Sequence, residues 1–251
     1  MRVRNVAAAL FVVVMTATCV RLGFWQLSRL REKQALNAAL RSALARPPLW
    51  ITGIETPVDS VRGRRVELRG VYDERRQILL AGRAHDGAPG VSVVTPLLVD
   101  PGHAVLVERG WLYSDDASTA HPERDPEPGT HVVIGMAAPF PVGRRGPSWR
   151  QVASDSATLW STRWLDPDSL AARLPYAVAG FAVRQLPGAG VSPRPLRTPP
   201  AAYDEMMHVS YAVQWFLFAA ILSGGSLILA FGRRRPVPTL VPPARPRDEA
   251  G

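Results

Sequence analysis

The sequence predicts an integral membrane protein in which two transmembrane α-helices flank one mostly-β (α+β) extramembrane domain. Residues 6–20 and 209–231 carry no charge, and between them lie short alternating or β-branched runs separated by Gly, Pro and Asp. At a rise of about 1.5 Å per residue, the second uncharged run covers the roughly 30 Å of a bilayer's hydrocarbon core. In a chain of 251 residues, the intervening stretch has room for one soluble domain.

Residues 1–5 form a short N-terminal segment, and residues 6–27 are predicted as the first transmembrane helix. Its uncharged part has the length of a signal-peptide core, but no small-residue cleavage site follows it. Arg21 can extend its guanidinium to the interface, and Trp25 is a typical interfacial anchor. We therefore expect an uncleaved helix.

Residues 28–46 are predicted to continue this helix beyond the membrane, because leucines recur every four residues until Pro47 ends the pattern. Arg21, Trp25 and Arg29 repeat at the same interval and share one face. This spacing permits a cation-π cluster at the interface, or a set of groups facing a ligand.

Residues 47–186 are predicted as a β-rich domain. Asp166 and Pro167 are typical of the start of a short helix over 166–174. The expected strands are Arg65–Tyr72, Gln77–Gly82, Ser92–Val99, Ala104–Trp111, His131–Ala138, Thr158–Trp164 and Tyr176–Leu186.

Residues 187–205 are predicted as a Pro-rich linker, 206–231 as the second transmembrane helix, and 232–251 as a cytoplasmic Arg/Pro-rich tail. The arginines 233–235 place the C-terminus inside by the positive-inside rule. The charges flanking the first helix favour the opposite orientation, but long loops translocate largely regardless of charge. We therefore expect both termini in the cytoplasm and the central domain on the periplasmic side.

Several classes of function are disfavoured. Cys19 is the only cysteine, so disulfides and paired-cysteine metal sites are not expected. The net charge of +9 comes from scattered arginines without the aromatic-basic interleaving of nucleic-acid modules, so we expect no nucleic-acid partner. No nucleophile elbow, phosphate-binding loop or zinc helix is present, so we expect no enzyme.

The candidate site is the start of the second helix. His208, Tyr211 and Trp215 stand at i, i+3 and i+7 and therefore share one helical face. A flat aromatic ligand could lie on the two aromatic rings while His208 supplies a nitrogen ligand. Interfacial anchoring explains the same residues, because Trp and Tyr gather at membrane interfaces.

A copper site is the other metal hypothesis. Met206 and Met207 precede His208, and thioethers suit cuprous copper. Adjacent residues of a helix point apart, however, and Met is also an ordinary apolar filler.

The chain resembles the surfeit-locus family of cytochrome c oxidase assembly (biogenesis) factors. The resemblance extends over 22–232 with gaps, and the order of four blocks makes it specific. The blocks are Leu22-Gly23-Phe24-Trp25-Gln26-Leu27-Ser28-Arg29, Val94-Thr95-Pro96-Leu97, Val105-Leu106-Val107-Glu108-Arg109-Gly110-Trp111 and His208-Val209-Ser210-Tyr211-Ala212-Val213-Gln214-Trp215-Phe216. Trp111 is followed by Leu112-Tyr113, where many relatives have an aliphatic residue and Pro.

The resemblance implies a bacterial plasma (inner) membrane protein that assists haem A insertion or retention in the catalytic subunit of a haem-copper oxidase. It makes His208 the candidate axial ligand of the haem iron. Its implied partners are the oxidase catalytic subunit, haem A synthase and membrane lipid.

The hypothetical haem A site consists of aromatic residues that pack on the haem and arginines that pair with its propionates. Tyr211, Trp215 and Trp25 would pack on the macrocycle, and Arg21, Arg29 or Arg109 would pair with its propionates. Two alternatives remain: a scaffold that holds the oxidase subunit or haem synthase without binding haem, and a copper-delivery factor.

Overall fold

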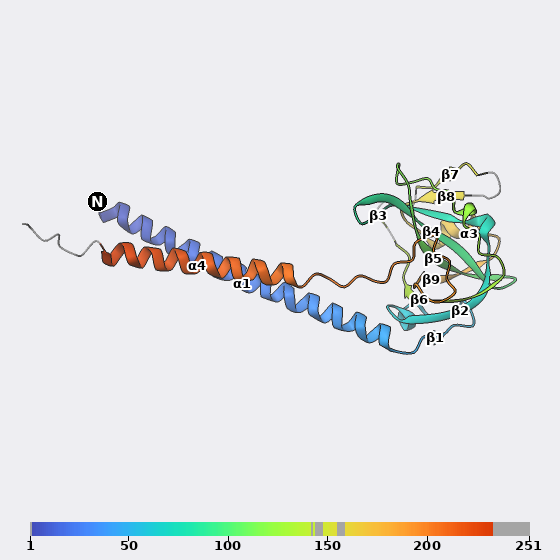
Figure 1. Cartoon of the computed structure of the whole chain (residues 1–251), viewed down its shortest axis with the longest axis horizontal. Helices are drawn as coiled ribbons and strands as arrows, with labels where there is room; N and C mark the ends of the chain where they lie inside the picture. Colours follow the sequence, from blue (N-terminus) through green and yellow to red (C-terminus); the bar gives the residue numbers. More distant parts are fainter. Residues whose placement is uncertain (1, 142, 144–147, 155–158, 233–251) are drawn as a thin grey trace, which may run out of the picture. The chain divides into compact units, whose positions relative to one another are not determined.

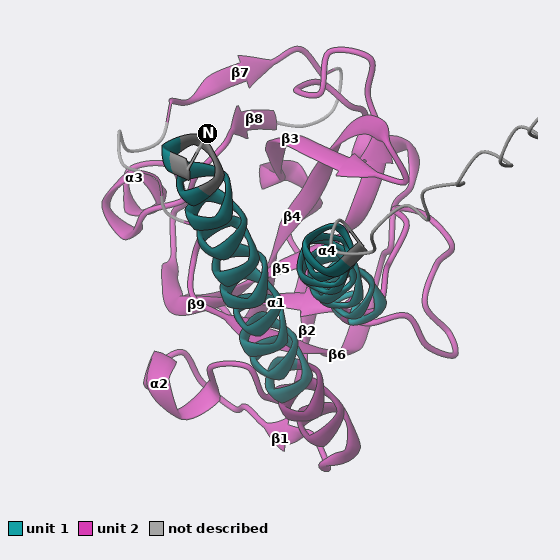
Figure 2. Ribbon diagram, turned by 90° about the vertical axis from the view of Figure 1, so that its left-hand side faces the viewer, with its two compact units in different colours: residues 1–36, 203–251 teal, residues 37–202 magenta. Residues whose placement is uncertain are grey.

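The computed structural model describes residues 2–141, 143, 148–154 and 159–232. The chain divides into two compact units, one formed by residues 1–36 and 203–251 and the other by residues 37–202 (Figure 2). The expected cytoplasmic tail lies outside the described residues from position 233 onward.

Two long helices, α1 (Arg2–Ala45) and α4 (Met206–Gly232), stand at the ends of the described chain. Both contain apolar windows long enough to cross a bilayer, with mean hydropathies of 2.0 and 1.8. Helix α1 is unbroken, so the expected span and its extension form one helix that ends two residues before Pro47. The chain is a two-span membrane protein with a mostly-β domain between its spans, as the sequence predicted.

Residues 37–202 form the β-rich unit (Figure 1). All seven predicted strands are present. The two that were not predicted, β1 and β7, have only two and three residues, too few to show an alternating pattern. The strands are β1 (Leu49–Trp50), β2 (Arg65–Tyr72), β3 (Ile78–His85), β4 (Ala88–Asp100), β5 (His103–Tyr113), β6 (Thr130–Ala138), β7 (Arg150–Val152), β8 (Leu159–Thr162) and β9 (Ala177–Gln185).

The sheet closes on itself. Its strand order is β1-β2-β6-β9-β5-β4-β3-β8-β7, and an additional pairing of β2 with β4 completes a ring of five strands. Strand β4, the longest, runs past the ring and carries β3, β8 and β7 as an extension. Closure pairs the five ring strands with one another, and among the described residues the short strands β1 and β7 end the sheet.

The interior of the ring is apolar. Inward residues of all five ring strands form this core with α2 (Val58–Val61), and Phe181 of β9 is fully buried in it. Two further apolar clusters cover the two faces of the β3-β4-β5 extension. Helix α3 (Pro167–Ala171) packs Leu170 into one of them, and the side chain of Asp166 caps it by accepting from the Ser169 amide at 2.9 Å.

Part of the Pro-rich segment 187–205 is built into the β-rich unit. Leu196 and Trp111 exchange two backbone hydrogen bonds, of 2.8 and 2.9 Å, which adds a bridge to β5. Gly110 makes this approach possible, because a Cβ at its φ of 153° would lie 2.5 Å from the Leu196 carbonyl oxygen. The expected linker is therefore anchored to the domain as far as Arg197, which is buried.

Candidate functional site

Helices α1 and α4 lie side by side (Figures 1 and 2), and the contacts between them join residues 23–33 of α1 to residues 203–216, at and just before the start of α4. Their contacts run in opposite directions along the two sequences: Lys33 meets Tyr203, Gln26 meets His208, and Gly23 meets Phe216. The pair is therefore antiparallel.

Small side chains allow the two helices to approach closely. Cys19 of α1 and Ala212 and Ala219 of α4 are nearly inaccessible. A Cβ at Gly23 would lie 2.7 Å from the ring of Phe216, so glycine is required for that ring to fit. Close packing of this kind drives association in lipid, where helices gain no hydrophobic energy from pairing.

A polar contact joins the helices where α4 begins. Nδ1 of His208 lies 2.9 Å from Oε1 of Gln26, whose side chain is 8% exposed. Because an amide oxygen only accepts hydrogen bonds, Nδ1 is the donor, and in the neutral form of the ring Nε2 is then the nitrogen with the free lone pair. Among the described residues, Nε2 has no hydrogen-bond partner. This is the tautomer and the orientation that a metal-ligating histidine needs.

Gln26 is the site residue that sequence reasoning missed. It belongs to the block that carries the family resemblance, but it was not singled out as a site residue. One sequence feature could have identified Gln26: it is an uncharged amide in an otherwise apolar stretch. It also lies three residues after Gly23 and seven after Cys19, so it shares one helical face with these small residues.

The aromatic candidates differ in exposure. Tyr211 and Trp25 are about half exposed, whereas Trp215 is partly buried and contacts the ring of Phe218 edge-on at 5.9 Å. Tyr211 and Trp25 are thus half-exposed aromatic residues that lie close in the sequence to His208 and Gln26.

The arginines of the first-helix stripe face away from the buried side of α1. Arg21 and Arg29 are exposed. Arg29 lies 6.0 Å from the centre of the Trp25 ring and pairs with Glu32 at 2.6 Å. The expected cation-π cluster at the interface is therefore present for Trp25 and Arg29, and the guanidinium of Arg29 remains accessible.

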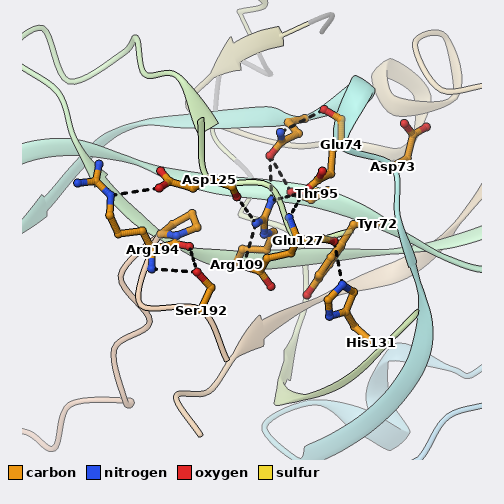
Figure 3. Close-up of polar contacts among 12 residues, drawn as sticks. Tyr72, Asp73, Glu74, Thr95, Arg109, Asp125, Glu127, His131, Ser192 and Arg194 are labelled. Atoms are coloured by element: carbon orange, nitrogen blue, oxygen red, sulfur yellow. Dashed lines mark hydrogen bonds and ion pairs between the residues drawn. The ribbon is translucent and has the colours of Figure 1, made fainter. Parts of the chain in front are cut away.

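Arg109 belongs to the β-rich unit and is fully buried (Figure 3). Its Nη2 donates to Glu127 at 2.8 Å and to the Asp125 carbonyl at 2.9 Å, while Nη1 donates to Gln77 and Glu74. A guanidinium enclosed by these acceptors is not accessible to an external carboxylate. This burial corrects the sequence-based hypothesis that Arg109 could pair with a propionate.

Glu127 is the centre of this buried network. Its carboxylate accepts hydrogen bonds from both Arg109 and Arg197, and Arg197 also donates to the Gln185 side chain at 3.1 Å. Burial alone raises the pKa of Glu127, but the two guanidinium groups outweigh that effect and hold the pKa below its usual value. The network joins η1 (Glu74–Arg76), β5, the segment that follows η2 (Pro122–Arg124), β9 and the anchored linker.

The residues considered for copper binding are on the outer surface of α4. Met206 and Met207 are 67% and 48% exposed. Within the described part of the chain, no group of three or more His, Cys, Asp or Glu side chains is arranged to hold a metal ion.

Two antiparallel membrane helices that enclose an oriented histidine, joined to a closed β-rich domain, define a class of two-span membrane proteins with a single extramembrane domain. The chain belongs to the SURF1 family, whose family model matches residues 13–220. The family expected from the four sequence blocks is thus confirmed.

Similar proteins come from bacteria and eukaryotes. A SURF1-like protein of Rickettsia felis is 32% identical over 134 residues, which are 51% of this chain and 56% of the relative. Surfeit locus protein 1 of Takifugu rubripes is 30% identical over 118 residues, 41% of this chain and 49% of the relative. Cytochrome oxidase assembly protein SHY1 of Saccharomyces cerevisiae is 33% identical over 94 residues, 36% of this chain and 24% of the relative. The chain spans about half the length of the bacterial relatives it matches.

Proposed function

We propose that this chain is an assembly factor for a haem-copper (cytochrome c) oxidase, and that it holds haem A for insertion or retention in the catalytic subunit. Membership of the SURF1 family supports the assembly role, as does the name of the yeast relative. In this proposal His208 is the axial ligand of the haem iron.

The observation that carries the proposal is the contact between His208 and Gln26. A histidine that ligates a metal usually donates its other ring N–H to a fixed acceptor, which sets the tautomer and the plane of the ring. Gln26 is such an acceptor, at 2.9 Å from Nδ1. Nε2 then offers its lone pair without prior rearrangement of the ring.

The surroundings of His208 have the chemistry that a porphyrin needs. Tyr211 and Trp25 expose ring faces on which an aromatic macrocycle can stack, and Trp215 adds apolar contact on the same helix. Arg21 and Arg29 are the candidate propionate partners, because guanidinium matches carboxylate bidentately. A site open on one side suits a carrier, which must later release its cargo.

The proposed location is the bacterial plasma (inner) membrane, with both termini cytoplasmic and the β-rich domain on the outer side. The arginines at positions 233–235 support this orientation by the positive-inside rule. The proposed partners are the oxidase catalytic subunit, which receives the cargo, and haem A synthase, which supplies it.

The test is the absorption spectrum of the full chain, co-expressed with the genes for haem A synthesis and purified in detergent. We expect a Soret band in the wild type and a large loss of bound haem in His208→Ala. His121→Ala is the matched control, because His121 is an exposed histidine that pairs with Glu123.

Three other outcomes are informative: the first contradicts the ligand assignment, and the other two support a different function. Unchanged haem content in His208→Ala would contradict the ligand assignment. Purification with the oxidase subunit or haem synthase attached but without any Soret band would support a scaffold. Copper binding that is lost in Met206→Ala/Met207→Ala would support copper delivery.

A further inference from the structure

The β-rich unit contains an apolar hollow of about 420 Å³, which is within the range of small-molecule pockets (about 300–1,000 Å³). Leu80, Val94 and Leu165 contribute apolar side chains to it. Pro139 and Pro141 also line it. Most of the lining surface is therefore hydrocarbon.

The register of β6 against β9 explains why a hollow forms here. Ala138 of β6 pairs with Ala182 of β9, and the next outward row places Met136 opposite Arg184. Alanine side chains end at Cβ, so neighbouring longer side chains leave a space above them. The strand pairings thus place a small-residue row beside a charged one.

The charged groups at the hollow are mostly cationic. Arg62, Arg83 and Arg184 line it, with Glu108 as the one acidic group. Glu108 is paired with Arg184 at 3.2 Å, and Arg62 is paired with the highly exposed Asp59. Among the described residues, the guanidinium of Arg83 has no carboxylate partner.

We propose that this hollow binds an anionic phospholipid, with one acyl chain on the Ala138–Ala182 row and the lipid phosphate on Arg83 and Arg184. An apolar surface beside three arginines and one glutamate, with Arg83 lacking a carboxylate partner among the described residues, is complementary to a molecule with a long hydrocarbon chain and a phosphate. A soluble anion would leave the hydrocarbon surface in water, and a neutral lipid would leave Arg83 without a counter-charge.

The position of the hollow in the chain favours a membrane lipid as the source. Leu40, on the helix that continues from the first membrane span, contributes to the lining. Pro200 also contributes, six residues before α4 begins. Both segments that connect the domain to its membrane spans therefore line the hollow. Phospholipids surround the membrane spans themselves, so they are available as ligands.

The test uses the full chain in detergent micelles, with a bimane label on Leu40→Cys, a lining position outside the Ala138–Ala182 row, in a Cys19→Ala background. Phosphatidylglycerol and phosphatidylcholine with the same brominated acyl chains are titrated, because bromine quenches the label only when an acyl chain reaches it. We expect phosphatidylglycerol to quench at a concentration at least about fivefold lower than phosphatidylcholine, as expected for one or two phosphate–arginine contacts.

Two charge variants isolate the arginines. Arg83→Gln/Arg184→Gln should remove the preference for phosphatidylglycerol, whereas Arg75→Gln/Arg150→Gln removes the same charge outside the hollow and should keep it. Unlabelled Ala138→Trp should reduce the number of phosphatidylglycerol molecules retained, as counted by native mass spectrometry.

Three results would overturn the proposal. They are equal quenching by the two lipids, a preference that persists in Arg83→Gln/Arg184→Gln, and full competition by the free headgroup glycerophosphoglycerol at the same concentration as the lipid. His208→Ala should leave the preference unchanged, so the lipid result is independent of the proposed haem site.

Discussion

The two units of this protein bury polar groups in different ways. The helix pair holds a part-buried hydrogen bond between His208 and the uncharged amide of Gln26, beside small side chains. The β-rich unit buries a charged one, in which Glu127 accepts from Arg109 and Arg197. A single hydrogen bond contributes about 0.5–1.5 kcal/mol and leaves the second ring nitrogen of His208 available to a ligand, whereas a buried ionic cluster is strongly destabilised when one member is lost. The difference separates a region suited to binding from one suited to holding a fold.

The largest effect is expected from Glu127→Gln. The amide keeps the shape of the carboxylate but leaves Arg109 and Arg197 buried without their shared counter-charge, which should destabilise the β-rich unit by about 3–5 kcal/mol. Urea unfolding followed by circular dichroism measures this. Glu32→Gln is the control, because it removes an exposed pair and should cost less than about 1 kcal/mol. An equal loss of unfolding free energy in the two variants would show that the buried ion pairs of the β-rich unit stabilise the protein no more than an exposed pair on α1.

Acidification should release part of the same stabilisation. The pKa of Glu127 is lowered in the folded state, so its contribution is present above the ordinary glutamate pKa of about 4.3 and is lost as pH falls through the folded-state pKa. Unfolding midpoints measured between neutral and acidic pH should therefore fall more steeply in the wild type than in Glu127→Gln. Parallel curves would show that Glu127 does not contribute this linkage.

Gly23→Val should loosen the helix pair without affecting the β-rich unit. The new side chain would collide with the ring of Phe216, and overpacking of this kind costs about 1–3 kcal/mol. Spin labels at the exposed positions Ser28 and Val213 should report a broader distance distribution. Ala17→Val, on the exposed side of α1, should leave the distribution unchanged.

Gln26→Leu tests whether the neutral contact serves binding. Loss of the group that orients a ligating histidine typically lowers affinity by about 10–100-fold, so haem retention should fall while the unfolding midpoint of the β-rich unit stays the same. Gln26→Glu keeps an acceptor for Nδ1 and should retain most of the binding. A similar loss in both variants would show that Gln26 acts through packing alone.

The smallest effect is expected from Arg29→Gln. Arg29 and Glu32 are each about half exposed, and such pairs contribute between zero and about 1 kcal/mol. Thermal unfolding should barely change. A change in the unfolding temperature as large as that of Glu127→Gln would mean that an ion pair on the exposed face of α1 stabilises the fold as strongly as the buried ion pairs of the β-rich unit.

Sequence patterns found some features of the site and missed others. The pattern His208, Tyr211 and Trp215 located the start of α4, and the Trp25–Arg29 spacing indicated their contact, because both are set by the geometry of one helix. Arg109 was assigned a ligand role from its charge, and the structure buries it instead. Charge alone cannot distinguish these cases, because burial depends on strands brought together from distant parts of the chain.

The sequence by itself determined the two membrane helices, the seven longer strands of the β-rich unit and the family, since apolar length, alternation and short motifs are local properties of the chain. Only the tertiary structure decided which polar groups meet. Gln26 and His208 are 182 positions apart, and Glu127 and Arg197 are 70 apart. A periodic sequence pattern cannot predict contacts between residues so far apart, because these contacts are fixed by how the helices pack and how the β-sheet closes.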